Sequence, residues 1–461
     1  MLNRSIMNKN RIEKLREGVE KGKLVIYWMR SAHRIKDNHA LLRAIKLSNE
    51  LKVSLKVIVV FPEHILKQTE RFLYFYLGGL KEVQLSFQKM KINFTVLMNP
   101  QIKSINEEFK DVSHLVTDKV YLKEDLKFED KILEMLSKDI SIEVIDTNVI
   151  VPVRKASDKM EYGAYTIRRK LTQQLEDYLD LEELPTYKGP HYENNNSLII
   201  DNIEKIVNLK FPLRDRSVSK SKYFFGGELE AVNRLKFFLE KKISFYSERN
   251  HPGENVTSSL SPYIRFGYIS TNRIVHELRN ALKTNKIKKI DYDSFIEQLF
   301  VRRELAFNFV TYQKNYDVFE YITEPWCYQT MKEHALDKRD YIYSLSDLEN
   351  CNTHDKYWNS SMKEMKKSGY MHNYMRMYWA KKIIEWTNNY KEAFKYTIYL
   401  NNKYFLDGND PNSYTGVAWN YGRHDRPWIE RKIFGKLRYM NSKGLERKFD
   451  MQTYIDFVNK L

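Results

Sequence analysis

The chain has 461 residues, of which 42% are hydrophobic and 14% aromatic, and it carries a formal net charge of +17 with a pI near 9.3. This length and composition exclude a disordered protein, allow two or three folded domains, and indicate a polyanionic partner. No run of about 18 apolar residues occurs and residues 1–23 lack an apolar core, so we expect neither a membrane span nor export.

The first third of the chain alternates short strands with helical stretches. Runs rich in β-branched residues predict strands at residues 24–29, 55–61, 94–98, 114–117 and 142–145. This alternation is typical of a parallel, Rossmann-like sheet with helices on both faces. The motifs G-x-G-x-x-G and G-x-x-x-x-G-K-[ST] are absent from this region, so the usual nucleotide-binding signals are missing. We expect an α/β domain over residues 20–180.

The rest of the chain reads as a linker followed by a helical domain. Residues 181–215 contain Pro185, Gly189, Pro190 and three consecutive Asn, which predict an exposed interdomain connection. From residue 216 the strand signals fade, and long amphipathic patterns at 292–310 and 357–386 predict a mainly α-helical domain up to residue 461.

Residues 410–431 combine turn formers, aromatic residues and cations. Gly416, Gly422 and Pro427 predict an irregular loop in which Trp419 and Trp428 lie among arginines. Residues 421–448 hold nine Lys or Arg against three acids, a pattern that suits phosphates, and flat aromatic faces suit an unstacked nucleobase. The alternative is a solvated surface loop whose two Trp fill a core.

A hydroxyl-rich segment, residues 257–261, precedes Pro262 and offers donors to a pyrophosphate just ahead of a helix. An ordinary helix N-cap is the alternative interpretation. The histidines are scattered without an H-x-x-x-H pair, so we expect no metal site. Cys327 and Cys351 are too few for a disulfide framework and are expected to be free thiols in a reducing compartment.

Taken in order, these segments resemble the photolyase/cryptochrome family, and the subtype resembled is class II cyclobutane pyrimidine dimer photolyase. The matching stretches are residues 27–30, 37–42, 156–163, 257–263, 301–305, 371–380, 410–431 and 434–440. The resemblance implies an antenna-type N-terminal α/β domain and a helical domain that binds FAD. It also implies light-driven DNA repair, in which reduced FAD donates an electron to a dimer flipped out of duplex DNA and splits it.

The resemblance also assigns residues to the flavin. Arg376 would pair with Asp407 beside the ring and favour its anionic reduced form, and Asn401 would lie near flavin N5. Asp407, Asn409 and Asp410, around Gly408, could equally be ordinary turn residues. The full set of implied cofactor contacts is Tyr246, Thr257, Ser258, Ser259, Leu260, Ser261, Arg303, Asn373, Arg376, Asp407, Asn409 and Asp410.

Other residues are assigned to the lesion and to electron supply. Glu297 and Met377 would contact the dimer, although Val301 or Arg302 stands where the family often has an aromatic residue. A class II relay would run from Trp379 beside FAD through Trp358 to a more exposed Trp386, with plain core packing as the alternative. Val417 replaces the Trp used by other classes. Glu304 could simply pair with an arginine of the neighbouring turn.

The implied partner is duplex DNA that contains a cyclobutane pyrimidine dimer. Trp419 and Trp428 would flank the dimer, while Asp425 and Arg426 could bridge the gap left in the duplex. The cations assigned to DNA phosphates are Arg423, Arg426, Arg431, Lys436 and Arg438. We expect a monomer in the cytoplasm, or in the nucleus of a eukaryote, and the antenna domain could hold a second chromophore of unknown identity.

Three alternatives share part of this pattern. A non-repairing cryptochrome-type photoreceptor would use the same flavin scaffold, but the chain ends at Leu461 without a signalling tail. A flavin-free nucleic-acid-binding protein would need only the basic aromatic loop and would leave the FAD-type segments unexplained. The 6-4 photoproduct as substrate is disfavoured by the class II pattern.

Overall fold

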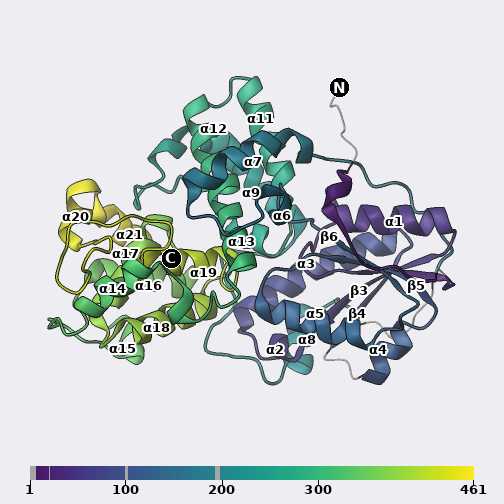
Figure 1. Ribbon diagram of the computed structural model, residues 1–461, viewed down its shortest axis with the longest axis horizontal. Helices are drawn as coiled ribbons and strands as arrows, with labels where there is room; N and C mark the ends of the chain where they lie inside the picture. The colour runs from purple at the N-terminus through teal and green to yellow at the C-terminus, as the bar shows by residue number, and fades with distance from the viewer. Residues whose placement is uncertain (1–6, 20, 99–101, 193–197) are drawn as a thin grey trace.

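The computed structural model describes residues 7–19, 21–98, 102–192 and 198–461, which form an α/β lobe and a helical lobe (Figure 1). The described part of the α/β lobe contains a six-stranded sheet with the order β1-β6-β5-β2-β3-β4. The five predicted strands are present, with ends within two residues of those expected. The strands are β1 (Ile12–Arg16), β2 (Leu24–Trp28), β3 (Ser54–Phe61), β4 (Asn93–Met98), β5 (Val112–Asp118) and β6 (Ser141–Ile145).

Strand β1 was not predicted. It pairs antiparallel with β6, whereas all the other neighbours in the sheet are parallel. Its side chains are exposed or half-buried, and charged residues in an edge strand give no hydrophobic run for a sequence pattern to detect.

Helices cover both faces of the sheet, which is why every residue of β2 is buried. Val25 and Tyr27 pack with α1 (His39–Leu51) and α3 (Glu70–Lys89) on one face. Ile26 and Trp28 pack with α4 (Ile102–Glu108) and α5 (Lys123–Met135) on the other. The short helices of this region are α2 (Glu63–Leu66), α6 (Val153–Ala156) and α8 (Ile203–Lys210).

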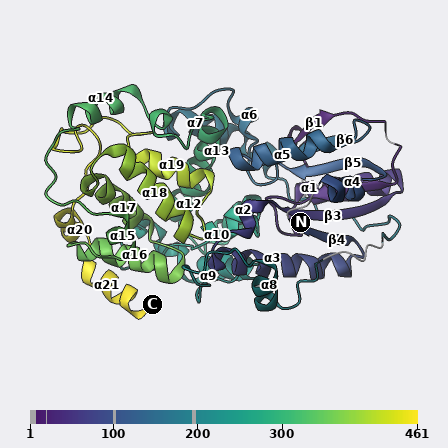
Figure 2. The ribbon, with the colours of Figure 1, turned by 90° about the horizontal axis from the view of Figure 1, so that it is seen from below.

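The helical lobe is a group of packed helices that lies beside the α/β lobe in both views (Figures 1 and 2). Its members are α7 (Ala164–Tyr178), α9 (Glu228–Lys241), α10 (Ser261–Arg265), α11 (Thr271–Lys283), α12 (Lys289–Ile296), α13 (Arg303–Tyr312), α14 (Pro325–Glu333), α15 (Leu345–Glu349), α16 (Lys356–Ser368), α17 (Asn373–Trp386), α18 (Tyr390–Tyr404), α19 (Pro411–Asn420), α20 (Ser442–Lys448) and α21 (Met451–Lys460). No helix of the described ranges has the length and apolar character needed to cross a bilayer.

Four expectations about this region need correction. The pattern at 357–386 is two helices, because Gly369 leaves α16 in the left-handed region (φ +86°). Gly416 lies inside α19 instead of breaking it. Helix α7, assigned to the α/β domain, packs against the helical lobe at residues 297–302. The expected linker contains α8, which packs on α3, while Asn194 to Asn196 lie outside the described residues.

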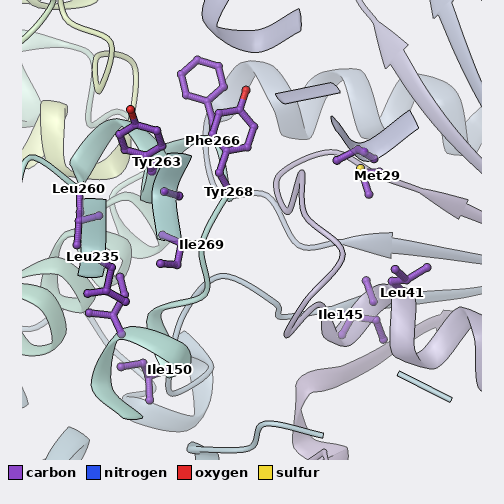
Figure 3. Packing of buried hydrophobic residues seen from close by; sticks show 14 of the residues in the cluster. Met29, Leu41, Ile145, Ile150, Leu235, Leu260, Tyr263, Phe266, Tyr268 and Ile269 are labelled. Carbon is purple, nitrogen blue, oxygen red and sulfur yellow. The ribbon is translucent and has the colours of Figure 1, made fainter. Parts of the chain in front are cut away.

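One hydrophobic core runs through both lobes. Figure 3 shows Met29, Leu41 and Ile145 on the side of the sheet and Tyr263 and Phe266 on the side of the helical lobe, within one continuous cluster. Because burial of apolar surface is the dominant favourable term in folding, we expect the two lobes to unfold together.

Buried Arg11 ties the start of the chain to the end of α7. Its guanidinium group pairs with Asp180, with an Nη2–Oδ1 distance of 2.9 Å, and donates to the carbonyl oxygens of Asp146, Val149, Ile150 and Tyr178. Burial opposes ionisation of Asp180, but His39 and Arg11 outweigh it and hold its pKa well below the usual range. The pair is stabilising only while both charges are present.

We therefore predict that Arg11→Met destabilises the protein by about 3–5 kcal/mol, because the substitution leaves Asp180 buried and charged without its main partner. Urea unfolding followed by circular dichroism measures the change. Lys14→Met, which removes an exposed pair with Glu17, is the matched control and should change stability by less than about 0.5 kcal/mol. Equal effects of the two substitutions would contradict the structural role of Arg11.

Candidate functional site

A partly buried ion pair joins three segments that are far apart in the chain. Arg376 on α17 contacts Asp407 through two hydrogen bonds of 2.9 and 3.0 Å, and Ser261 at the start of α10 donates to the same carboxylate at 2.5 Å. Burial opposes the charge of Arg376, but the attraction of Asp407 outweighs it and raises the pKa of the guanidinium group. The pairing of Arg376 with Asp407 is therefore observed as expected.

The hydroxyl-rich segment leads into this pair. Tyr370 donates to Thr257 at 3.4 Å, Ser258 accepts from the backbone of Leu260 at 3.4 Å, and Ser259 has a φ of +53°. Leu260 is buried beneath it. Of this segment, the Ser261 hydroxyl contacts the Asp407 carboxylate, while Tyr246 packs its ring edge-on against aromatic side chains of the core.

The turn after α18 is held by its own polar residues. Asn409 has a φ of +50°, donates its backbone N–H to Asn402 and accepts from Tyr414 at 2.8 Å. Asp410 caps α19 by accepting from the backbone of Asn412. Asn409 and Asp410 therefore act as turn and cap residues, the alternative left open by the sequence. Asn401, buried on α18, donates to Asn402 at 2.9 Å.

Among the buried donors that have no acceptor in the described residues, two belong to residues that the resemblance assigns to the flavin or to electron supply. One is Nη1 of Arg303, whose Nη2 donates to the carbonyl oxygen of Asn148 at 2.8 Å and whose guanidinium group lies over the ring of Phe307. The other is the indole N–H of Trp379 on α17. Buried donors without acceptors, next to a fixed positive charge, fit a ligand rich in acceptor atoms such as a flavin nucleotide. Asn373, the first residue of α17, is exposed.

Glu297 lies in a π-helical turn, η3 (Glu297–Arg302), which joins α12 to α13. Arg168 of α7 donates to both of its carboxylate oxygens at 3.0 and 2.9 Å, and Arg302 donates at 2.9 Å. Burial opposes ionisation, but these hydrogen bonds outweigh it, so the pKa of Glu297 is lowered. The carboxylate is half-buried, ionised and aimed by two cations. A π turn inside an α-helix frequently marks a functional site.

Glu304 lies elsewhere than expected. It does not form an ion pair with an arginine of the next turn. It accepts the backbone N–H groups of Ile150 and Val151 in the α/β lobe. Burial raises its pKa to about 8, against the opposing effects of Arg303 and of these N–H groups. Glu304 is therefore a contact between the lobes.

Three tryptophans form a buried file along α16 and α17. The indole N–H of Trp358 donates to the carbonyl oxygen of Trp379 at 3.0 Å, and the rings of Trp358 and Trp386 are 5.8 Å apart. The expectation of a more exposed Trp386 is wrong, since only 2% of it is exposed. Tyr343 and His354 cover its ring edge-on at 5.5 and 5.1 Å.

The basic aromatic segment presents cations on indole rings. Arg438 lies 5.0 Å from the ring centre of Trp419 and 4.3 Å from that of Trp428, and it pairs with Asp425 at 2.9 Å. Arg426 lies 5.7 Å from the ring centre of Trp428, which is 39% exposed. The cluster thus places exposed aromatic area and positive charge together.

Arg423 does not belong to this exposed cluster. It is 2% exposed, forms an ion pair with Glu324 and donates to the carbonyl oxygen of Ile322 at 2.9 Å. It therefore cannot reach a phosphate, and its expected role is corrected to a structural one. Arg426, Arg431 and Lys436 are exposed. Gly422 (φ +96°) is required nearby, because a Cβ there would lie 2.3 Å from Sγ of Cys327.

Both cysteines are free thiols, as predicted. The described residues contain no group of three or more His, Cys, Asp or Glu arranged to hold a metal ion. The polar groups of the site are thus the carboxylates, guanidinium groups and hydroxyls described above.

Comparison with known proteins identifies the family of this chain. The family model for DNA photolyase matches residues 25–190. The deoxyribodipyrimidine photo-lyase of Methanothermobacter thermautotrophicus is 36% identical over 96% of this chain and 96% of its own length. That of Arabidopsis thaliana is 38% identical over 95% of this chain and 89% of its own length. The chain belongs to the DNA photolyase family.

Solved structures of photolyases share the fold. The bacterial class III photolyase from Agrobacterium tumefaciens superimposes with a TM-score of 0.73 at 16% identity, covering 95% of this chain and 86% of that chain. The archaeal photolyase from Sulfolobus tokodaii, solved with two FAD molecules, gives a TM-score of 0.69 at 16% identity over 94% and 89%. At this identity the likeness concerns the fold, an α/β domain followed by a helical domain.

Two residues of this photolyase site were not predicted. Arg168 is one, because nothing in the sequence near it signals a partner 129 residues away. The other is Lys381, which is fully buried on α17, donates to the carbonyl oxygen of Asn420 at 2.6 Å and lies 5.7 Å from the ring centre of Trp419. Two lysines next to each other at 381 and 382 look like a solvated face in the sequence, yet both are buried.

Lys381 yields a pH-dependent prediction. Burial lowers its pKa to about 7, while an unfolded lysine has a pKa near 10.4, so the unfolded state binds more protons between these values and stability rises with pH across that window. Lys381→Met removes this titration. The stability of the variant relative to wild type should fall by about 1 kcal/mol for each pH unit between pH 7.5 and 9.5.

Urea unfolding at several pH values tests this prediction. Lys395→Met on α18, which removes an exposed lysine, is the control and should show no such slope. A difference between Lys381→Met and wild type that stays constant with pH would contradict the prediction.

Proposed function

We propose that this chain is a class II cyclobutane pyrimidine dimer photolyase that binds FAD and repairs ultraviolet-damaged DNA with light. The observation that carries the proposal is the meeting of three elements in one helical lobe. They are the partly buried Arg376–Asp407 pair beside the hydroxyl segment, the Glu297 carboxylate held by Arg168, and the cluster of cations on Trp419 and Trp428. Relatives along nearly the whole chain are named deoxyribodipyrimidine photo-lyases, which supports the same conclusion.

The residues around the Arg376–Asp407 pair fit FAD. The hydroxyl groups of residues 257–261 and the backbone N–H groups beside them would hold the phosphates and ribitol. The buried N–H groups of Arg303 and Trp379 would each gain an acceptor, and Arg376 would stabilise a negative charge on the ring. When bound, reduced FAD supplies the electron for dimer cleavage. Asn401 is proposed to lie near the ring, with Asn373 at the entrance to the site.

The remaining site residues act on DNA. A dimer must leave the duplex to reach a buried cofactor, and its weakened stacking lowers the cost of flipping. Glu297, held ionised by Arg168 and Arg302, would accept hydrogen bonds from the pyrimidine N–H groups, and Met377 would pack against the dimer. Trp419 and Trp428 would flank it. The exposed cations, Arg426, Arg431, Lys436 and Arg438, would bind phosphates, with Asp425 and Arg426 beside the gap.

The tryptophan file supports the class II assignment. The indole N–H of Trp358 bonds to the backbone of Trp379 at 3.0 Å, and the ring centres of Trp358 and Trp386 are 5.8 Å apart, separations that are short enough for electron hopping. Val417 occupies the position where other classes have a Trp. An antenna chromophore in the α/β lobe, a monomeric state and a cytoplasmic or nuclear location complete the proposal. A non-repairing cryptochrome would share the flavin residues, so only a repair assay separates the two.

The repair assay is direct. The purified protein, loaded with FAD and reduced, should restore an oligonucleotide that contains a thymine dimer under near-ultraviolet light and leave it unchanged in the dark. A flavin-loaded protein that binds the dimer yet never splits it would favour the cryptochrome alternative. A folded protein that cannot be loaded with FAD would exclude both.

Trp379→Phe should separate electron supply from repair. Phenylalanine fills most of the space of the indole but is far harder to oxidise, so photoreduction of the oxidised flavin should be nearly lost. Protein that is reduced chemically beforehand should still split dimers at a near-normal yield, because repair returns its electron. If the tryptophans only pack the core, the substitution would instead lower stability and leave photoreduction per bound flavin unchanged.

The basic cluster yields a salt-dependent prediction. Arg431→Gln or Lys436→Gln should each lower the slope of log Kd against log salt by about 0.9, because one phosphate contact is lost. Fluorescence anisotropy with a dimer-containing duplex at several salt concentrations measures the slope. Lys395→Gln on α18 is the control, with no expected change. An unaltered slope for both cluster variants would rule out their phosphate role.

A further inference from the structure

Two exposed tyrosines lie at the start of α7, outside the residues assigned above. Tyr162 is 41% exposed and Tyr165 is 68% exposed, and their ring centres are 6.1 Å apart with planes tilted by 60°. Met160, also exposed, precedes them. Neighbouring large side chains that stay exposed to solvent indicate a surface used for binding.

Tyr162 contacts the loop that carries His424 and Asp425, which is called the lesion loop below. His424, whose φ is +61°, contacts the carbonyl oxygen of Tyr162 through Nδ1 at 2.6 Å, and the Tyr162 hydroxyl donates to the carbonyl oxygen of Asp425 at 3.5 Å. A Cβ at Gly163 would lie 3.5 Å from the Tyr165 ring and 3.9 Å from the carbonyl oxygen of His424. The two tyrosines and the loop that carries Asp425 therefore form one continuous surface.

Helix α7 also contacts the carboxylate of Glu297, which is proposed above to bind the dimer. Arg168 follows Tyr165 by three residues, so the two side chains share a face of α7, and Arg168 holds Glu297 through two hydrogen bonds. Tyr165 thus lies within one helical turn of the residue that orients Glu297. A strand of DNA that delivers a dimer to Glu297 must pass close to this tyrosine.

The charge around the pair suits DNA. Within residues 154–169 the exposed cations are Arg154, Lys155, Lys159 and Arg169, against one exposed acid, Asp158. The nearby acid Glu161 is buried and paired with Lys170. Aromatic faces among cations are the combination that binds single-stranded nucleic acid without sequence preference.

We propose that Tyr162 and Tyr165 form a second stacking platform, which binds a nucleobase left unstacked beside the dimer when the dimer is flipped out. This inference rests on the proposed function and adds to it a site for the opened duplex. Flipping leaves bases that have lost a neighbour or a pairing partner. Stacking one of them on a ring already held against the lesion loop would stabilise the opened DNA and leave undamaged duplex unaffected.

The test uses the full chain loaded with FAD and kept in the dark. Dissociation constants are measured for wild type, Tyr165→Ala, the double variant Tyr162→Ala/Tyr165→Ala and Tyr165→Phe. The duplexes carry 2-aminopurine either opposite the dimer or next to it on the same strand, and a third duplex is undamaged. Tyr399→Ala, which removes another exposed tyrosine on α18, is the matched control. Equal melting temperature and FAD content establish that each variant is folded.

The alanine variants should bind dimer-containing DNA about fivefold or more weakly, with little change for undamaged duplex, while Tyr165→Phe binds like wild type. Quenching of 2-aminopurine by wild type should be lost in the alanine variants, and the duplex in which this occurs identifies the strand that contributes the base. Unchanged affinity and fluorescence in both labelled duplexes would overturn the proposal, as would equal losses on damaged and undamaged DNA. Wild type that shows no preference for the dimer would instead refute the proposed function itself.

Discussion

The ion pair between Arg376 and Asp407 is the constraint on which the site depends. Removing charges from water is costly, and in this partly buried pair the mutual contact and further hydrogen bonds offset that cost. Ser261 and the carbonyl oxygen of Met371 supply those bonds. Because the pair binds α10, α17 and the turn before α19 together, each of these segments is held in place by the other two. The hydroxyl segment ends at α10, Trp379 and Trp386 lie on α17, and the loop that carries Asp425 follows α19.

The two lobes depend on each other through buried polar contacts as well as through the shared core. Arg11 closes one end of the contact and Glu304 another, since both bind backbone atoms of the segment 146–151. Without the helical lobe, Arg11 would lose Tyr178 and Asp180, and the backbone N–H groups of Ile150 and Val151 would lose the Glu304 carboxylate. The α/β lobe is therefore a structural part of the helical site even where it provides no residue to it.

Much of this arrangement could be predicted from the sequence, and the failures have physical reasons. The five parallel strands are short runs rich in β-branched and other apolar residues, which mark strands buried on both faces. Strand β1 and buried Lys381 were not predicted, because the sequence of a charged edge strand and that of a buried lysine both resemble solvated surface. Gly416 sits in a helix because packing overrides intrinsic propensity.

The site itself was predictable mainly where a motif carried it. Arg376 and Asp407 pair as the family resemblance implied, but their contacts follow from no local pattern. Arg423 was misassigned because its partner Glu324 lies 99 residues away in the chain. The role of Arg168 was missed for the same reason, because its partner Glu297 lies 129 residues away in the chain. Contacts between remote segments decide which cation is buried and which remains free for DNA, and a single sequence does not contain that information.

The π-helical turn at Glu297 has a consequence for how this helix tolerates changes in length. A π turn carries one more residue per turn than the α-helix around it, so it acts as an insertion that the helix has absorbed without a loop. Deleting one residue within 297–302 would let α12 and α13 join as a regular helix, and the residues after 302 would keep nearly the same orientation, because the π turn uses one extra residue for the same rotation. Arg303 and Glu304 would then keep their partners in the α/β lobe. The extra residue thus widens the helix only at the turn that carries Glu297, and it leaves unchanged the face on which Glu304 meets the neighbouring lobe.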